Sequence, residues 1–128
     1  RPYEFRLKGA RMLWVLGMIG AAVIGAILRW QVGELFRAAQ FPWATLLVNG
    51  VGGFFMGFVH AQTQWPSGIK LVVGVGFLGA FTTFSAFAWD TIRLWENRQG
   101  LLALVNIFAN NLSALGLCAV AYYWFHGF

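Results

Sequence analysis

The sequence predicts an all-α integral membrane protein with four transmembrane helices, the third of them broken. Hydrophobic residues make up 59% of the 128 residues, charged residues only 10%, and the mean hydropathy is +0.67. A soluble domain carries about 25% charged residues, so this chain cannot cover itself with a polar surface. The chain also contains four uncharged runs, and the third has glycine and hydroxyl residues at its centre.

The four uncharged runs are close to the roughly 20 residues that a helix needs to cross hydrocarbon. They are Met12–Leu28, Phe41–Val59, Leu71–Trp89 and Leu101–Phe125. A basic segment precedes the first run, as in a secretory signal, but three similar runs follow it and we interpret it as a retained span. We therefore expect one transmembrane domain over residues 1–128, with spans at about 12–30, 41–60, 70–90 and 101–125.

Small residues recur at four-residue spacing in the first two runs. The first run carries Gly17, Ala21 and Gly25, and the second carries Gly53 and Gly57. This spacing lets helix backbones approach closely in lipid. We expect both sets to form seams between packed helices.

The centre of the third run favours a break in the helix. A Gly-Ala-Phe-Thr-Thr segment lies there, and glycine costs about 1 kcal/mol relative to alanine in a helix. Thr82, Thr83 and Ser85 can divert backbone hydrogen bonds to their own side chains. Because non-helical backbone at membrane depth must be buried by protein or line a polar cavity, a break near residues 79–83 is a candidate ion site.

Several neutral polar residues lie within the spans. Asn49 is near the middle of the second run, where its amide can donate to an anion or hydrogen-bond a neighbouring helix. Asn106 and Asn110 are four residues apart on the fourth run and share a face, with Ser113 next along it. Together with Thr45, these side chains can line a polar file through the bundle.

Four phenylalanines recur at helical spacing in the third run: Phe77, Phe81, Phe84 and Phe87. Such a stripe is typical of packing. Its functional alternative uses the positive edge of the phenyl ring, which can face an anion. Thr82 and Ser85 would add hydroxyl donors beside the rings.

The cationic residues indicate membrane anchors and a possible double orientation. The net charge is +5, but the nine Lys and Arg stand singly at the ends of apolar runs, which favours interfacial anchors over a nucleic-acid surface. Four crossings place five of them on the side of the termini and four on the other side. Since orientation follows an excess of Lys and Arg, this near balance predicts insertion both ways and an antiparallel homodimer.

The sequence does not indicate an enzyme, and two alternatives to an ion site remain. His60 and His126 have no acid or cysteine at ligand spacing, and nucleophile and phosphate motifs are absent. A small multidrug-type dual-topology exporter needs a membrane-embedded carboxylate, which the first run lacks. A non-transporting helical scaffold explains the glycine seams but not the asparagines beside a mid-membrane break.

Four segments carry a resemblance to a known family. They are Leu-Arg-Trp at Leu28–Trp30, Thr-Leu-x-x-Asn-x-x-Gly-Gly-Phe at Thr45–Phe54, Gly-Phe-Leu-Gly-x-x-Thr-Thr-Phe-Ser-x-Phe at Gly76–Phe87, and Asn-x-Phe-x-Asn at Asn106–Asn110. In type and order they resemble the bacterial fluoride channels of the CrcB or Fluc type. The family's usual Gly-Gly at the break stands as Gly79-Ala80, where alanine resists any positive φ that glycine would permit.

The resemblance implies a fluoride-selective passive channel that exports F⁻ across the bacterial inner membrane. It implies an antiparallel, dual-topology homodimer in the lipid bilayer with two pores, and no nucleic-acid partner. It assigns pore roles to Asn49, Phe84 and Phe87 and a vestibule role to Arg29. Further pore positions are Thr45, Ser85, Asn106, Asn110 and Ser113. It also implies a structural Na⁺ at the dimer interface, held by the backbone carbonyls of Gly79 and Thr82.

Overall fold

The structure is a computed structural model that describes the backbone of residues 2–126 and the side chains of residues 8–126. Arg1 and Arg6, which enter the charge count above, lie outside the described side chains. The elements are α1 (Pro2–Leu35), α2 (Trp43–Ala61), α3 (Ser67–Lys70), the π-helix η1 (Leu71–Leu78), α4 (Gly79–Phe81), α5 (Phe84–Glu96) and α6 (Gly100–His126). Every element of the described part is helical.

Four helical segments are long and apolar enough to cross a membrane. By length and composition these are Lys8–Leu35, Trp43–Ala61, Ser67–Glu96 and Gly100–His126. The third combines α3, η1, α4 and α5. The predicted all-α class and its four spans are therefore confirmed, and helix α1 continues to Leu35, beyond the predicted end at residue 30.

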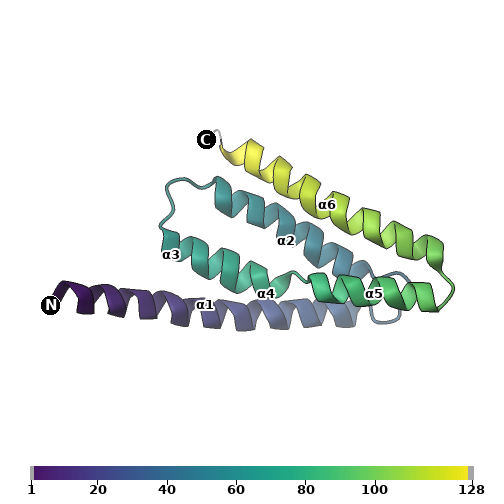
Figure 1. The fold of residues 1–128 in the computed structure, drawn as a ribbon, viewed down its shortest axis with the longest axis horizontal. Coiled ribbons are helices and arrows are strands. Elements are labelled where there is room, and N and C mark those ends of the chain that lie inside the picture. Colours follow the sequence, from purple (N-terminus) through teal and green to yellow (C-terminus); the bar gives the residue numbers. More distant parts are fainter. Residues whose placement is uncertain (1, 127–128) are drawn as a thin grey trace.

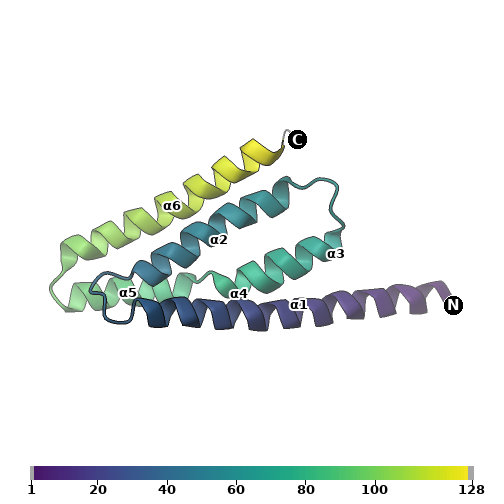
Figure 2. The same cartoon turned by 180° about the vertical axis from the view of Figure 1, so that it is seen from behind.

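The spans alternate in direction. Figure 1 shows α1 lying along the third span and α6 lying along α2, with both ends of the chain and the α2–α3 connection at one end of the molecule. The α1–α2 and α5–α6 connections lie at the other end, as Figure 2 shows from behind. This arrangement agrees with the four crossings on which the charge comparison rests.

The small residues form the predicted seams. A Cβ atom placed on Gly25 would collide with the carbonyl oxygen of Phe77 in η1, and one on Gly57 would collide with the carbonyl oxygen of Cys118 in α6. A Cβ atom on Gly53 would lie 2.7 Å from the carbonyl oxygen of Ala114. Helices α1 and α2 can lie so close to their neighbours only because these positions carry no side chain.

The third span is broken as predicted, but later than its glycine. Thr82 (φ −84°, ψ 159°) and Thr83 (φ −154°, ψ 116°) are extended, and we call these two residues the break. Gly79 is helical (φ −61°, ψ −35°) and Gly79–Phe81 is helix α4. The only non-glycine residue with positive φ in the described part is Arg98, so Ala80 needs no conformation that alanine resists.

Both threonine hydroxyls bond to the backbone at the break. Thr82 Oγ1 donates to the carbonyl oxygen of Leu78 (3.0 Å), and Thr83 Oγ1 accepts the backbone N–H of Ala86 (3.1 Å). Thr83 is thus the N-cap of α5. The expected diversion of a backbone hydrogen bond to a hydroxyl group is confirmed at Thr83, whereas at Thr82 the backbone N–H still bonds to the carbonyl of Leu78 (2.9 Å) beside the hydroxyl.

The sequence did not predict the π-helix before the break. In η1 the N–H of Gly79 reaches the carbonyl of Gly74, five residues earlier. Gly76 lies against the backbone of Met18, where a Cβ atom would stand 2.7 Å from the carbonyl oxygen. Wider π-type turns are rare in proteins, and those that occur often lie at functional sites. Helix η1 leads directly into α4 and the break.

Candidate functional site

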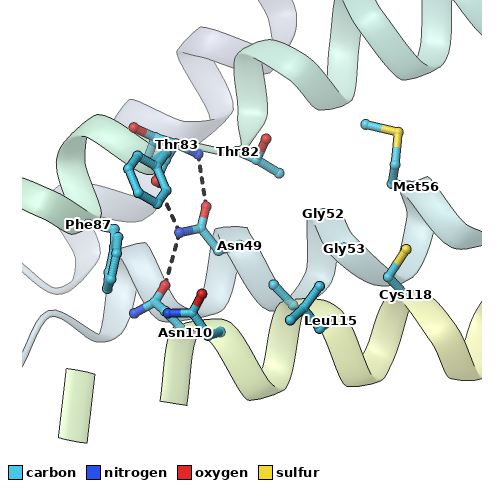
Figure 3. Close-up of a pocket in the computed structure, with 13 residues that line it drawn as sticks. Asn49, Gly52, Gly53, Met56, Thr82, Thr83, Phe87, Asn110, Leu115 and Cys118 are labelled. Carbon is cyan, nitrogen blue, oxygen red and sulfur yellow. Dashed lines mark hydrogen bonds between the residues drawn. The ribbon is translucent and has the colours of Figure 1, made fainter. Parts of the chain in front are cut away.

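The break is held by one side chain from α2. Asn49 Oδ1 accepts the N–H of Thr83 (2.8 Å), and Asn49 Nδ2 donates to the carbonyl of Thr83 (3.1 Å), as Figure 3 shows. The amide of Asn49 thus satisfies both backbone groups of an extended residue at membrane depth. Because the backbone N–H can only donate and the carbonyl can only accept, this pairing also fixes which way the Asn49 amide points.

These bonds leave two backbone carbonyls without their helical donors. In an unbroken helix the N–H of Thr83 would bond to the carbonyl of Gly79, and the N–H of Ala86 would bond to that of Thr82. The first N–H is taken by Asn49 Oδ1 and the second by Thr83 Oγ1. Gly79 and Thr82 are the two residues whose carbonyls the sequence comparison singled out for a cation.

A directional chain of hydrogen bonds, which we call the amide relay, runs from the break into α6 and back to α5. Asn49 Nδ2 donates to Asn110 Oδ1 (2.9 Å), and Asn110 Nδ2 donates to Asn106 Oδ1 (2.8 Å). Asn106 Nδ2 then donates to Thr91 Oγ1 (2.9 Å), which donates to the carbonyl of Phe87 (2.8 Å). The two α6 asparagines are 0% and 4% exposed. The relay therefore satisfies buried amides that would otherwise be costly in an apolar bundle.

A groove of about 380 Å³ opens beside the break. Its lining comes from α2, the break, α5 and α6 and includes Asn49, Gly52, Gly53, Thr82, Thr83, Phe84, Phe87, Asn110 and Ala114. Figure 3 shows the Asn49 and Asn110 amides facing each other at its polar end, near the Phe87 ring. No charged side chain is among the described residues that line it. The groove is thus apolar apart from neutral hydrogen-bonding groups.

Two phenylalanines of α5 border this groove at different depths. Phe87 is 9% exposed, whereas Phe84 is 78% exposed. Their ring centroids lie 5.4 Å apart with the planes tilted by 56°. Phe77 and Phe81, before the break, form a separate stacked pair at 5.8 Å. The break therefore divides the predicted phenylalanine stripe into two pairs.

A second cavity, of about 300 Å³, contains Arg29 and Thr45. Thr45 Oγ1 donates to Asp90 Oδ2 (2.6 Å), and Asp90 Oδ1 lies 3.3 Å from Arg93. The Thr45 hydroxyl thus donates to the Asp90 carboxylate and not to the asparagine amides with which we grouped it. Thr83 lines both this cavity and the groove, so the break forms part of the wall of each.

The two serines predicted for the site occupy supporting positions. Ser85 Oγ lies 3.3 Å from Thr83 Oγ1, next to the N-cap of α5. Ser113 donates to the carbonyl of Asn110 on its own helix (3.3 Å) and lies near Gly50. Neither serine is among the residues that line the groove.

Comparison with known proteins identifies the family. The family model of the CrcB-like protein, camphor resistance (CrcB), matches residues 15–122, from the middle of α1 to near the end of α6. The chain belongs to the CrcB-like family.

Relatives of this CrcB-like chain carry the name fluoride-specific ion channel FluC. The protein of Acinetobacter baylyi is 40% identical over 119 residues, which cover 86% of this chain and 94% of the relative. The protein of Bordetella petrii is 39% identical over 110 residues (79% and 85%). That of Shewanella denitrificans is 43% identical over 94 residues (68% and 75%).

Sequence reasoning missed two residues of this CrcB-like site. Thr83 was noted only as a helix breaker. Its backbone N–H and carbonyl both bond to the Asn49 amide, and its hydroxyl caps α5. Its place before a helical run was a readable N-cap signal. Thr91 ends the amide relay. No spacing in the sequence predicts this role of Thr91, because its partner Asn106 lies on the next helix, 15 residues further along the chain.

Proposed function

We propose that this CrcB-like chain is a fluoride-selective passive channel of the bacterial inner membrane and that it catalyses no reaction. The observation that carries the proposal is the uncharged groove at the break, where amide and hydroxyl groups meet phenyl rings at membrane depth. The relatives named fluoride-specific ion channels support it, since they match most of this chain at 39–40% identity.

The chemistry of the groove suits a small, strongly hydrated anion. A selective pore must replace the water around the ion and still release it. Neutral amide donors and the positive edges of Phe84 and Phe87 provide modest attraction, whereas a buried lysine or arginine would hold the anion tightly. The vestibule role of Arg29 is compatible with its cavity, which lies on the other side of Thr83.

A second, inverted copy of the chain would close the pore. Phe84 is 78% exposed although it borders the groove, and the groove is open along its side. The near balance of Lys and Arg on the two sides permits either orientation. An antiparallel homodimer would cover Phe84 and complete each groove with residues of both subunits.

The orientation can be tested by labelling. A cysteine added at the C-terminus of a Cys118→Ala variant should react equally with an impermeant reagent applied from either side of the membrane. Labelling from one side only would exclude the antiparallel dimer while leaving fluoride conduction to be tested separately.

The carbonyls of Gly79 and Thr82 fit a cation. Both lose their helical donors to the break, and carbonyl oxygens are ligands that hard cations prefer. A Na⁺ bound there at the dimer interface would satisfy these oxygens and add positive potential near the pore. Replacing Na⁺ by N-methylglucamine should lower the thermal stability of the dimer in detergent. An unchanged melting temperature would argue against the ion.

A passive pore suffices for export. Hydrogen fluoride crosses membranes as a neutral acid and ionises in a less acidic cytoplasm, which traps the anion. A membrane potential that is negative inside then favours exit by about 2.3 kcal/mol per charge per 100 mV. The channel therefore needs no energy source of its own.

Fluoride efflux from liposomes tests the function. The wild-type protein should empty fluoride-loaded liposomes, as followed with a fluoride-selective electrode. Asn49→Ser or Phe84→Ile should abolish efflux while the dimer stays intact in size-exclusion chromatography. Wild-type efflux no faster than that of empty liposomes would reject the channel, and export of cationic drugs would favour the dual-topology exporter.

A further inference from the structure

The donors of Asn49 are fully used inside the protein. Its Nδ2 carries two hydrogens, one directed to the carbonyl of Thr83 (3.1 Å) and the other to Asn110 Oδ1 (2.9 Å). In this arrangement Asn49 has no N–H left for an anion. An ion that uses Asn49 as a donor must therefore displace one of these two oxygens.

We propose that Asn110 sets how tightly the pore binds anions, because its side-chain oxygen occupies the Asn49 donor that a passing fluoride must take. This inference rests on the proposed channel function and deepens it. Asn110 Oδ1 is the displaceable partner, because Asn49 and Asn110 both line the groove. The Thr83 carbonyl belongs to the backbone of the break. Losing its bond to Asn49 would remove a hydrogen bond that holds the third span to α2.

The polarity of the relay does not allow Asn49 to turn its donor elsewhere. Turning the Asn49 amide over would place its oxygen against the carbonyl of Thr83 and its NH₂ against the N–H of Thr83. The direction set at Thr83 continues along the relay, since each amide donates to the oxygen of the next. Asn110 therefore presents oxygen, and not NH₂, to Asn49.

Asn110 is also braced from behind. Its Nδ2 is held by Asn106 Oδ1 (2.8 Å) and by the carbonyl of Asn106 (3.2 Å). Asn106 is held in turn by Thr91, whose hydroxyl is anchored on the carbonyl of Phe87. Moving Asn110 away from Asn49 strains these contacts. The whole relay therefore sets the free-energy cost of freeing the Asn49 N–H from Asn110.

An Asn49 N–H that is already bonded to Asn110 affects fluoride and chloride binding. Hydrogen bonds to an ionised acceptor are roughly twice as strong as those between neutral groups. Fluoride concentrates its charge on a small radius and can displace an amide oxygen, whereas chloride spreads its charge and gains less from the same N–H. The cost of displacing Asn110 Oδ1 is the same for every anion, so it leaves the ratio of the fluoride and chloride affinities unchanged. It lowers the occupancy by both, and chloride, which gains less from the N–H, falls below the occupancy that conduction needs.

The test compares three variants of the full chain in liposomes. Asn110→Leu removes the competing oxygen, Asn110→Ser shortens the side chain, and Thr91→Val removes only the hydroxyl at the far end of the relay. Initial efflux rates are measured over a range of fluoride concentrations with a fluoride electrode. Chloride efflux is measured in parallel. Gln62→Leu is the control, because it removes a carboxamide at the end of α2 whose one hydrogen bond among the described residues goes to the carbonyl of Phe58 in α2.

We expect the half-saturating fluoride concentration to fall about three- to tenfold in Asn110→Leu and Asn110→Ser, the factor of one hydrogen bond. Chloride efflux should appear in the same liposomes. Thr91→Val should shift both measurements in the same direction by less, since Asn110 keeps its oxygen but loses part of its bracing. The Gln62→Leu control should behave as wild type.

Two results would overturn the inference. One is an unchanged half-saturating concentration with chloride still excluded. The other is a higher half-saturating fluoride concentration in variants that elute as the wild-type oligomer. That result would make Asn110 a ligand or a packing residue. If the Asn110 variants do not fold, Thr91→Val decides alone, because a half-buried hydroxyl is its only loss. Failure of the wild type to conduct fluoride would instead reject the proposed function.

Discussion

Helices α2 and α6 meet in two halves of opposite character, although a single register governs both. Asn49 faces Asn110, and one turn later Gly53 faces Ala114, followed by Gly57 against Cys118. One half joins the helices through the directional amide bond between Asn49 and Asn110, and the other through close contact of backbones. The same four-residue step thus supplies both the functional groups and the seam that holds them.

The two halves contribute different things to the fold. Close packing in lipid draws helices together by dispersion, which does not by itself distinguish one register from another. Amide bonds add little energy each, about 0.6 kcal/mol on average in membranes, but they form only in the correct register. We therefore expect the small-residue half to dominate stability and the amide half to dominate geometry, and three substitutions test this division.

The largest effect is expected at the small-residue half. Gly57→Leu forces a side chain into the carbonyl oxygen of Cys118, and separating the helices should cost about 3 kcal/mol or more. The fraction of monodisperse protein that survives heating in detergent measures it. Gly116→Leu is the matched control on α6, because among the described residues nothing beyond its chain neighbours and its own helix backbone lies within 4 Å of the position of its Cβ. Equal damage from both substitutions would refute the seam.

An intermediate effect is expected at the amide half. Asn106→Leu removes two side-chain bonds of the relay, to Thr91 and Asn110, and should cost about 1–2 kcal/mol. Thermal unfolding in detergent provides the measurement. Asn111→Leu should change stability by less than about 0.5 kcal/mol, since this exposed amide bonds only to Ile107 on its own helix. A loss at Asn106 as large as that at Gly57 would erase the distinction between the halves.

The smallest effect is expected where the amide half meets the break. Thr83→Ala removes the N-cap of α5 and should cost about 1 kcal/mol. Thr83→Ser keeps the hydroxyl and should restore most of it, as judged by the melting temperature of the two variants. Asn49 would still hold the backbone of residue 83 in both. Identical melting temperatures would show that Asn49, and not the cap, carries the break.

Much of the fold could be read from local sequence. Uncharged runs of sufficient length predicted all four spans, because hydrocarbon excludes charge regardless of how the helices pack. The hydroxyl residues predicted the break. The extended residues, Thr82 and Thr83, lie within the predicted range 79–83, and Gly79 itself stays helical. The π-helix η1 was not predicted; its Gly76 packs against the backbone of Met18 in α1, a contact between residues far apart in sequence.

The site was predictable as a set of residues but not as a network. Asn49, Asn106 and Asn110 were identified because amides in an apolar span need partners. The bonds from Asn106 to Thr91, from Asn49 to Thr83 and from Asn49 to Asn110 span 15, 34 and 61 residues of sequence, and such distances leave no periodic signal. Thr45 shows the converse: one turn from Asn49 on the same helix, it bonds to Asp90 and lines a different cavity.

The sequence alone determined that this chain crosses a membrane four times, where its third span weakens and which neutral polar groups lie within the bilayer. These are properties of composition and spacing, and they act on each segment separately. Only the tertiary structure decided that Asn49 bonds to both backbone groups of Thr83 and that its remaining N–H donates to Asn110. Hydrogen bonds between helices depend on register and depth, which are set when the small-residue seams bring the backbones into contact.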